Sequence, residues 1–174
     1  MTGSVRIFPQ LTSAEEEEIL SECERIDAAA GTPILHKGEG GGDLYIVESG
    51  LFKVYEETPG DDFVLALLNP GDVFGELSFL DGSPRSASVR AQSDGSLLRL
   101  SRGDFPRLVL KNPYTATRLL FSLASIVSAR LRKADEALAD LAWGQQDASC
   151  EELHRIAAEM HRAVFQELTG LDGD

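Results

Sequence analysis

The sequence predicts a mainly β (α+β) fold: an antiparallel, jelly-roll-like β-roll flanked by an N-terminal helix and long C-terminal helices. Of the 16 glycines, 12 lie between Gly31 and Gly103, and the last of the seven prolines is Pro113. Turns are therefore concentrated in the middle of the chain. Apolar residues there alternate with a period of two, which is typical of strands, whereas after Pro113 they recur every three or four residues, which is typical of helices.

The first predicted element is a helix over residues 12–27, with Thr12 or Ser13 as its N-cap and acidic residues in its first turn. Ile19, Cys23 and Ile26 share one narrow apolar face at helical spacing. The glutamate run at residues 15–18 is interpreted as a capped, solvated turn, because charge runs are usually solvated faces.

The middle of the chain predicts six or more short strands, which favours a roll or barrel over βαβ units. In residues 44–49, Leu44 and Ile46 lie on one face, and Tyr45 and Val47 on the other. Further strands are expected in the segments LFKVYEE, FVLALL, ASVRA and SLLRLS. Three glycines at residues 40–42 predict a hairpin loop and not a phosphate loop, because no Gly-Lys-Ser/Thr follows them.

The C-terminal part predicts a short helix that stops before Pro113 and a long helix over residues 114–142. An apolar seam runs along the long helix: Leu120, Leu123, Val127, Leu131, Ala134, Leu138 and Leu141. A seam needs a partner, which is the roll, a second copy of the helix, or both. We therefore expect one domain at residues 1–142 and an acidic amphipathic tail helix at residues 143–174.

Composition limits the class of protein. A formal net charge of −13 argues against nucleic acid as the main partner, since phosphates are bound by Lys and Arg. No apolar run approaches the roughly 20 residues that span a bilayer, and the N-terminus lacks a secretory signal. Two cysteines, Cys23 and Cys150, cannot build a disulfide framework. These features predict a cytoplasmic protein without membrane contact.

The segment GDVFGELSFLDGSPRSASVRA, residues 71–91, contains the candidate site. Glu76 follows Gly75 and begins one turn of predicted helix, whose N–H groups can face an anion. A tight turn then leads to Arg85, whose guanidinium can hold a phosphate. Glu76 is an acceptor for a sugar hydroxyl. The pattern predicts a pocket for a molecule that has both a phosphate and a ribose.

FGELSFLDGSPRSASVRA resembles the phosphate-binding cassette of the cyclic nucleotide-binding domain family. That family includes regulatory subunits of cAMP-dependent protein kinase and bacterial catabolite activator proteins. The resemblance covers about residues 8–132, because ILHKG, DLYIVESG, LNPGDVFG and SLLRLSRGDFPRLVLKNP also match in order.

The resemblance implies roles for particular residues. Glu76 matches the acid that binds the ribose 2′-hydroxyl, and Arg85 matches the arginine that pairs with the cyclic phosphate. Further contacts through backbone N–H groups or a hydroxyl are implied for Gly75, Leu77, Ser86 and Ala87. In the family the purine is capped from the long C-terminal helix. Arg132, Lys133 or Asp135 could contact the base here, and the alternative is that these are solvated charges. cAMP is favoured over cGMP.

The resulting hypothesis is a stand-alone cAMP sensor that signals to an effector protein by moving its C-terminal helices, as a homodimer through the long helix. One alternative is a nucleotide-independent interaction scaffold with a degenerate site. Another is a transcription regulator of the catabolite activator type, which the acidic C-terminus disfavours: residues 134–174 contain ten acidic and two basic residues.

Catalytic and metal sites are not expected. The sequence contains no catalytic triad or convincing pair of acids, so no enzyme is predicted. His154 and His161 are seven residues apart, which is too far for an i, i+4 metal pair.

Overall fold

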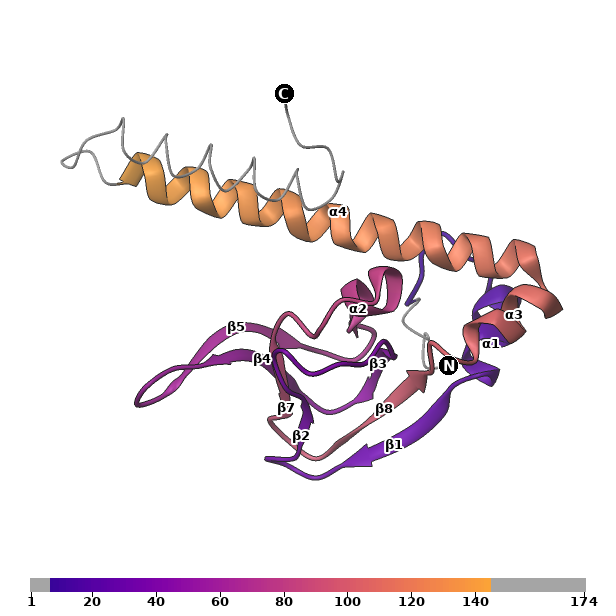
Figure 1. Ribbon diagram of the computed structural model, residues 1–174, viewed down its shortest axis with the longest axis horizontal. Helices are drawn as coiled ribbons and strands as arrows, with labels where there is room; N and C mark the ends of the chain where they lie inside the picture. Colours follow the sequence, from indigo (N-terminus) through magenta and orange to yellow (C-terminus); the bar gives the residue numbers. More distant parts are fainter. Residues whose placement is uncertain (1–6, 145–174) are drawn as a thin grey trace, which may run out of the picture. The chain divides into compact units, whose positions relative to one another are not determined.

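The computed structural model describes residues 7–144, with side chains described as far as residue 140. The elements, in order, are α1 (Ser13–Ser21), β1 (Glu24–Ala28), β2 (Pro33–Leu35), β3 (Leu44–Ser49), β4 (Phe52–Glu57), β5 (Asp62–Leu68), β6 (Val73–Phe74), α2 (Glu76–Asp81), β7 (Ser88–Ala91), β8 (Gly95–Leu100), α3 (Phe105–Lys111) and α4 (Pro113–Gly144) (Figure 1). The chain divides into two compact units, Met1–Val127 and Ser128–Asp174.

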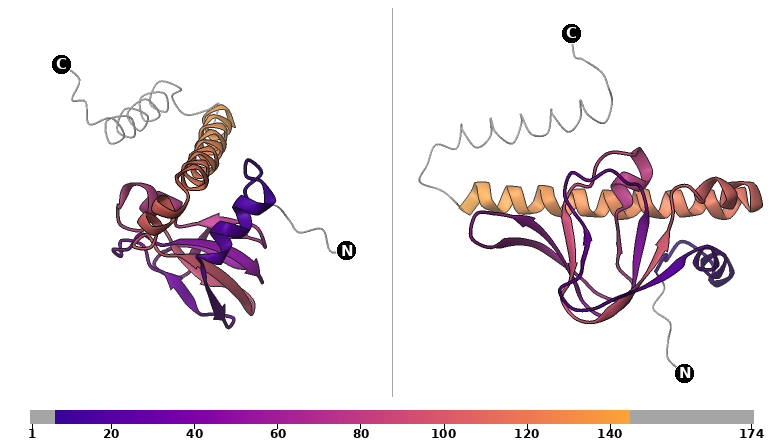
Figure 2. Two further views of the ribbon diagram at one scale, coloured as in Figure 1. Left: turned by 90° about the vertical axis from the view of Figure 1, so that its right-hand side faces the viewer. Right: turned by 60° about the horizontal axis from the view of Figure 1, so that its bottom comes forward.

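The strands form two antiparallel four-stranded sheets, in the orders β1-β8-β3-β6 and β2-β7-β4-β5 (Figure 2). The first sheet has Ile46 opposite Leu98, and the second has Phe52 opposite Leu68. Together with α1 and the long α4, this arrangement confirms the predicted antiparallel roll with flanking helices.

Strand β3 separates two apolar cores, as its period-two pattern predicts. Tyr45 and Val47 pack into the interior of the roll with Phe52, Phe74 and Leu97. Leu44 and Ile46 face the opposite way and pack with Phe8, which precedes α1, and with helix residues, Ile19, Leu119 and Leu123 among them. These first four residues of β3 are buried, because one side of the first sheet is covered by the second sheet and the other by helices.

The prediction of a helix through residue 27 is wrong in its last part. The start is correct, because Thr12 and Glu15 form a capping box. Helix α1 nevertheless ends at Ser21, and β1 pairs with β8 from Glu24 opposite Arg99 to Ala28 opposite Gly95. A ladder of non-local backbone hydrogen bonds outweighs the local helical spacing of residues 19, 23 and 26.

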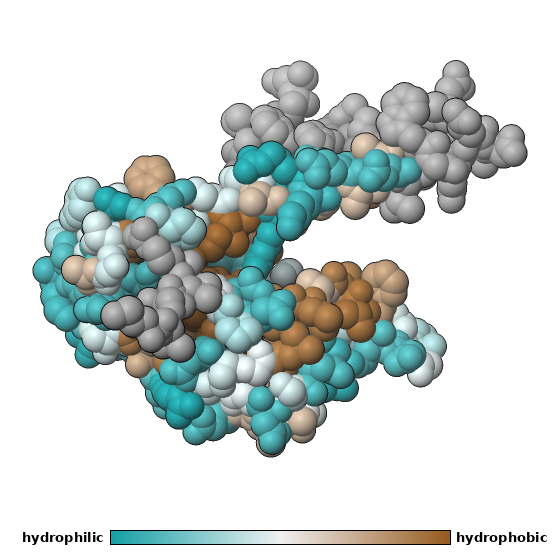
Figure 3. All heavy atoms as spheres, turned by 180° about the vertical axis from the view of Figure 1, so that it is seen from behind, coloured by the Kyte–Doolittle hydropathy of each residue, from teal (hydrophilic) through white to brown (hydrophobic). Residues whose placement is uncertain are grey.

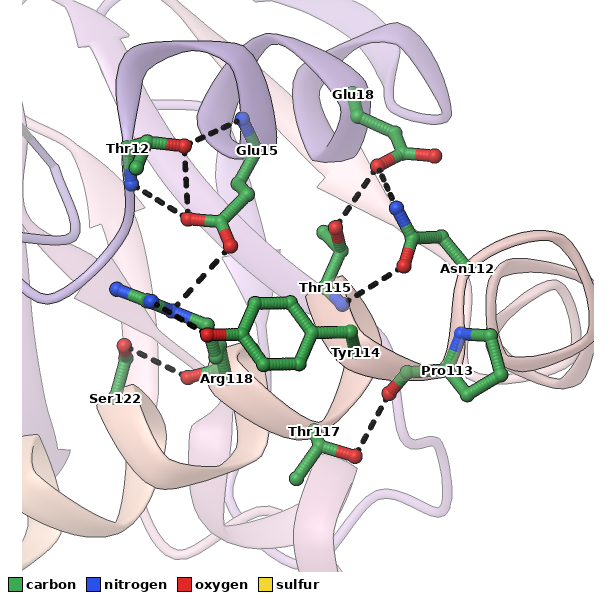
Figure 4. A network of polar contacts seen from close by, with 10 residues as sticks. All are labelled: Thr12, Glu15, Glu18, Asn112, Pro113, Tyr114, Thr115, Thr117, Arg118 and Ser122. Atoms are coloured by element: carbon green, nitrogen blue, oxygen red, sulfur yellow. Dashed lines mark hydrogen bonds and ion pairs between the residues drawn. The ribbon is translucent and has the colours of Figure 1, made fainter.

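The expectation that the glutamates of residues 15–18 are simply solvated is also wrong. Glu16 is buried and accepts a hydrogen bond of 2.8 Å from the Ile7 N–H. Glu18 accepts hydrogen bonds of 2.9 Å each from Asn112 Nδ2 and Thr115 Oγ1 (Figure 4).

Two further glutamates extend this contact along α1. Glu15 lies 3.5 Å from Arg118 (Figure 4). Glu22, the C-cap residue of α1, binds Arg107 at 2.8 Å and Lys111 at 2.9 Å. Hydrogen bonds and ion pairs thereby connect one face of α1 to α3 and to the first turns of α4.

Residues 40–42 do not form a hairpin loop as predicted. They connect β2 of the second sheet to β3 of the first, so the two strands that they join are not paired with each other. Two of the glycines instead lie beside arginine side chains, Gly41 beside Arg85 and Gly42 beside Arg102.

The predicted seam of α4 is buried only in part. Leu123 of the predicted seam is buried, but Leu120 is exposed. The other buried apolar residues of this stretch are Ala116 and Leu119, which the predicted seam does not include. Farther along, Leu131 and Leu138 are exposed. The predicted tail helix lies outside the described residues, and the expected division at residue 142 stays a prediction.

The β4–β5 hairpin carries a second exposed apolar group (Figure 3). Strand β5 is the end strand of its sheet. Its exposed apolar residues are Phe63, Val64, Leu65 and Leu67. None of the helices described between residues 7 and 144 is long and apolar enough to cross a membrane.

Candidate functional site

The candidate site is built around the turn between β6 and α2. Gly75 is the N-cap of α2 and has a left-handed backbone with φ of 77°. A Cβ atom there would lie 2.7 Å from the carbonyl oxygen of Asp43 and 2.8 Å from Arg85 Nη1. Only glycine tolerates both this conformation and this approach, so the tight contact between the turn and Arg85 depends on it.

Arg85 is held by hydrogen bonds to several backbone groups. Its side chain is buried, with 6% of the residue exposed. Nη1 donates to the carbonyl oxygens of Asp43 at 3.0 Å and Gly75 at 3.2 Å. Its own N–H donates to the Glu39 carbonyl at 2.9 Å, and its carbonyl accepts from the Gly38 N–H at 2.8 Å. Carbonyl oxygens orient a guanidinium without cancelling its charge, so this arginine is preorganised to meet an anion.

An aromatic pair supports the guanidinium from the roll. Arg85 lies over the ring of Tyr45, 5.8 Å from its centroid, and Tyr45 stacks on Phe74 at 5.1 Å. Burial raises the pKa of Tyr45 and the charge of Asp43 adds to this, while Arg85 and Arg99 oppose it. The Tyr45 hydroxyl therefore stays protonated near neutral pH, and its ring supports Arg85 by a cation–π contact.

The other predicted contact residues border Arg85 and the start of α2. Glu76 is the first residue of α2 and is 5% exposed. Leu77 and Ser86 are exposed, and Ala87 is half-buried. The structure thus joins Gly75 and Arg85 by a hydrogen bond and places Glu76, Leu77, Ser86 and Ala87 next to them in the chain; their ligand roles stay predictions.

The three residues predicted to cap a base lie elsewhere in the chain. Arg132, Lys133 and Asp135 belong to α4 in the unit that begins at Ser128, and all are exposed. Their contact with a base stays a prediction.

Sequence analysis missed several residues that shape this site. The carbonyl oxygen of Asp43 orients Arg85, and its carboxylate accepts a hydrogen bond of 3.1 Å from the Arg102 N–H. A Cβ atom on Gly41 would come within 3.5 Å of Arg85 Nη2. The available signal was the run of three glycines before Asp43, which marks close backbone approach.

The end of α2 is fixed by short-range polar contacts. Gly82 is the C-cap and its N–H donates to the Ser78 carbonyl at 3.0 Å, while Asp81 accepts from the Ser83 N–H at 2.8 Å. Desolvation raises the pKa of Asp81, but the hydrogen bonds from Ser83 and the charge of Arg102 outweigh it and lower the pKa overall.

Metal and thiol chemistry receive no support from the part of the chain that the structure describes. Among those residues, no group of three His, Cys, Asp or Glu side chains could hold a metal ion. Burial, with a smaller effect of Glu22, raises the pKa of the Cys23 thiol to about 12, so Cys23 is a poor nucleophile. Cys150, His154 and His161 lie outside the described residues.

The family model of the cyclic nucleotide-binding domain matches residues 25–112. The cyclic AMP receptor protein of Thermus thermophilus is 39% identical over 136 residues, which cover 78% of this chain and 61% of that protein. A cAMP-dependent protein kinase type II regulatory subunit of Drosophila melanogaster is 29% identical over 124 residues, 71% of this chain and 32% of that subunit. This chain therefore spans less than two thirds of these relatives.

Solved structures agree with this similarity. The Thermus thermophilus catabolite activator protein has a TM-score of 0.66 at 38% identity, covering 78% of this chain and 62% of that one. A protein from a cyclic-GMP-dependent signalling pathway in bacterial phytopathogenesis has a TM-score of 0.57 at 30% identity, covering 68% of this chain and 95% of that one.

Proposed function

This chain belongs to the cyclic nucleotide-binding domain family, and from that premise we propose that it is a sensor that binds cAMP at the cassette from Gly75 to Ala87. The observation that carries the proposal is the buried Arg85, oriented by the carbonyl oxygens of Asp43 and Gly75. A guanidinium oriented in this way suits a single anionic phosphate, because little conformational entropy of the side chain is lost on binding.

Each part of the ligand has a counterpart in the cassette. Arg85 pairs with the cyclic phosphate, with Ser86 and Ala87 beside it as further donors. Glu76 accepts a hydrogen bond from the ribose 2′-hydroxyl. Gly75 and Leu77 offer backbone N–H groups where α2 begins, which is the positive end of the helix. The proposed ligand is a nucleotide and the site needs no metal.

The preference for cAMP over cGMP is supported by relatives that are named for cAMP, in bacteria and in animals. One structural neighbour comes from a cyclic-GMP-dependent pathway, so cGMP is the competitor to test. Arg132, Lys133 and Asp135 are the proposed contacts to the base. Side chains that form hydrogen bonds with the exocyclic groups of the purine would distinguish cAMP from cGMP most strongly. With the wrong base, a polar group at the site would lose its hydrogen bond.

The proposed output is a change in what α4 presents to other proteins. Its exposed apolar residues, Leu131 and Leu138, suit a homodimer through this helix. An unidentified effector protein receives the signal, and ligand binding shifts the population of α4 positions. The charge of −13 argues against nucleic acid as a partner, since phosphates are bound by Lys and Arg. The proposed regulator is cytoplasmic and is not an enzyme.

The direct test is calorimetric titration with cAMP and cGMP, using protein unfolded and refolded to remove carried-over nucleotide. We expect cAMP to bind more tightly than cGMP. Arg85→Ala should weaken cAMP binding about 100-fold or more, because it removes charge-assisted hydrogen bonds to the phosphate. Arg107→Ala is the matched control: Arg107 is exposed, pairs with Glu22, and should leave the affinity unchanged.

Two outcomes would contradict the proposal. If Arg85→Ala binds cAMP as tightly as the wild type, the phosphate is held elsewhere. If neither nucleotide binds, and the oligomeric state is the same with and without cAMP, the protein is an interaction scaffold. The exposed apolar residues of β5 and of α4 would then be its contact surfaces.

A further inference from the structure

Arg102, between β8 and α3, lies against two glycines that are 40 residues apart in the sequence. A Cβ atom on Gly42 would overlap Cδ of Arg102 and lie 3.2 Å from its Cβ. A Cβ atom on Gly82 would lie 2.5 Å from Nη1 and 3.2 Å from Cζ of the same side chain. The stem of Arg102 therefore packs on the loop before β3, and its guanidinium packs on the end of α2.

These two segments position Arg85 and Glu76, the two charged residues of the cassette that are proposed to contact the ligand. The loop over residues 38–43 surrounds Arg85 through the carbonyl oxygens of Glu39 and Asp43. Helix α2 begins with Glu76 and ends at the Gly82 cap. The segments also meet directly, because a Cβ atom on Gly42 would lie 3.3 Å from the carbonyl oxygen of Ser78 in α2. Arg102 thus contacts both segments, the loop at Gly42 and α2 at its C-cap, Gly82.

Two polar features place Arg102 there. Its backbone N–H donates to the carboxylate of Asp43 at 3.1 Å, which ties the end of β8 to the loop. Helix α2 has no basic residue in its last turn, so the guanidinium beside Gly82 supplies a positive charge at the negative end of the helix. The same charge contributes to the lowered pKa of Asp81.

We propose that Arg102 is a positioning residue for the cyclic-nucleotide site. It holds the loop over residues 38–43 and α2 at the spacing at which Arg85 and Glu76 face one ligand. Arg102 touches the ligand-binding segments and not the ligand. This inference rests on the proposed function, since it concerns the same site.

The test compares Arg102→Ala and Arg102→Lys in the full chain by amide hydrogen exchange without nucleotide and by cAMP calorimetry. In Arg102→Ala we expect faster exchange at the N–H groups of Gly82 and Arg85, which bond to Ser78 and Glu39. Exchange of β3 amides, such as that of Ile46, should not change. The affinity for cAMP should fall about three- to fivefold, the size of one helix-terminus charge effect.

Arg102→Lys keeps an aliphatic stem and a positive charge and should restore most of the affinity. Arg107→Ala, in the following helix, is the matched control and should change neither measurement. Unchanged exchange at Gly82 and Arg85 in Arg102→Ala would overturn the inference. So would faster exchange with unchanged cAMP affinity, or an equal acceleration at every amide, which would report a general loss of stability.

Failure of the proposed function gives a different result. In that case the wild type binds no cyclic nucleotide, whereas exchange at Gly82 and Arg85 still responds to Arg102→Ala. The local contact would then stand, and the role in nucleotide binding would be overturned.

Discussion

The two halves of α4 have similar apolar spacing and different surroundings. In the first half, Ala116, Leu119 and Leu123 are buried in the core that also contains Phe8 and Ile19. In the second half, Leu131 is 45% exposed and Leu138 is 41% exposed. An amphipathic pattern therefore predicts that a helix face has a partner, but does not say which partner, because spacing only defines the face.

The strongest test of this comparison removes the same atoms from each half. Leu119→Ala should lower the free energy of unfolding by about 2–5 kcal/mol, because it leaves a cavity in a packed core. Leu138→Ala should change it by about 0.5 kcal/mol or less in the monomer, since the side chain is already exposed. Urea denaturation at low protein concentration measures both.

Equal losses of folding free energy in the two variants would show that the second half is also packed within one chain.

The proposed homodimer gives a further distinction between the two halves. Leu138→Glu should shift the protein toward monomers in sedimentation experiments, because it places a charge in the apolar contact between helices. Monomers at every concentration of the wild type would contradict the homodimer.

The start of α4 is also held by polar contacts, and these should contribute less. Glu18→Ala removes the acceptor for Asn112 and Thr115, of which Thr115 is fully buried. We expect a loss of about 1–2 kcal/mol of folding free energy. Glu17→Ala, at the exposed neighbouring position, should be nearly neutral. If both variants unfold at the same urea concentration, the Glu18 contacts do not stabilise the first half of α4.

The smallest expected effect is a pH dependence at Glu22. A hydrogen bond from Lys111 lowers the pKa of Glu22 from 4.5; desolvation opposes it, and the charges of Lys111 and Arg107 add to the lowering. A carboxylate whose pKa is lowered in the folded state stabilises the protein above the unfolded value of 4.5. That contribution is lost as the pH falls through the lower, folded pKa.

Urea midpoints measured from about pH 6 down to about pH 3 should therefore fall less in Glu22→Gln than in the wild type. Glu17→Gln provides the control and should follow the wild type. High salt should reduce the difference, because the ion pairs with Arg107 and Lys111 are partly exposed. Identical pH profiles for Glu22→Gln and wild type would remove this ion-pair cluster as a contributor.

The predictions that held rest on local signals. Gly75 and Gly82 bracket α2 as expected, and the alternation in β3 separates two cores. The errors came where distant segments decided the outcome. Residues 24–28 became a strand by pairing with β8, and Glu18 became a hydrogen-bond acceptor through contact with residues more than 90 positions away.

By itself, the sequence determined the class of fold, the turn that exposes the start of α2, and the candidate pair Glu76 and Arg85. These follow from properties of neighbouring residues: glycine conformation, side-chain periodicity and charge. Only the tertiary structure decided that Asp43 orients Arg85 and that Arg102 packs on Gly42 and Gly82. Those contacts join residues 20 to 60 positions apart, and such proximity results from how the sheets and helices pack, which no local pattern encodes.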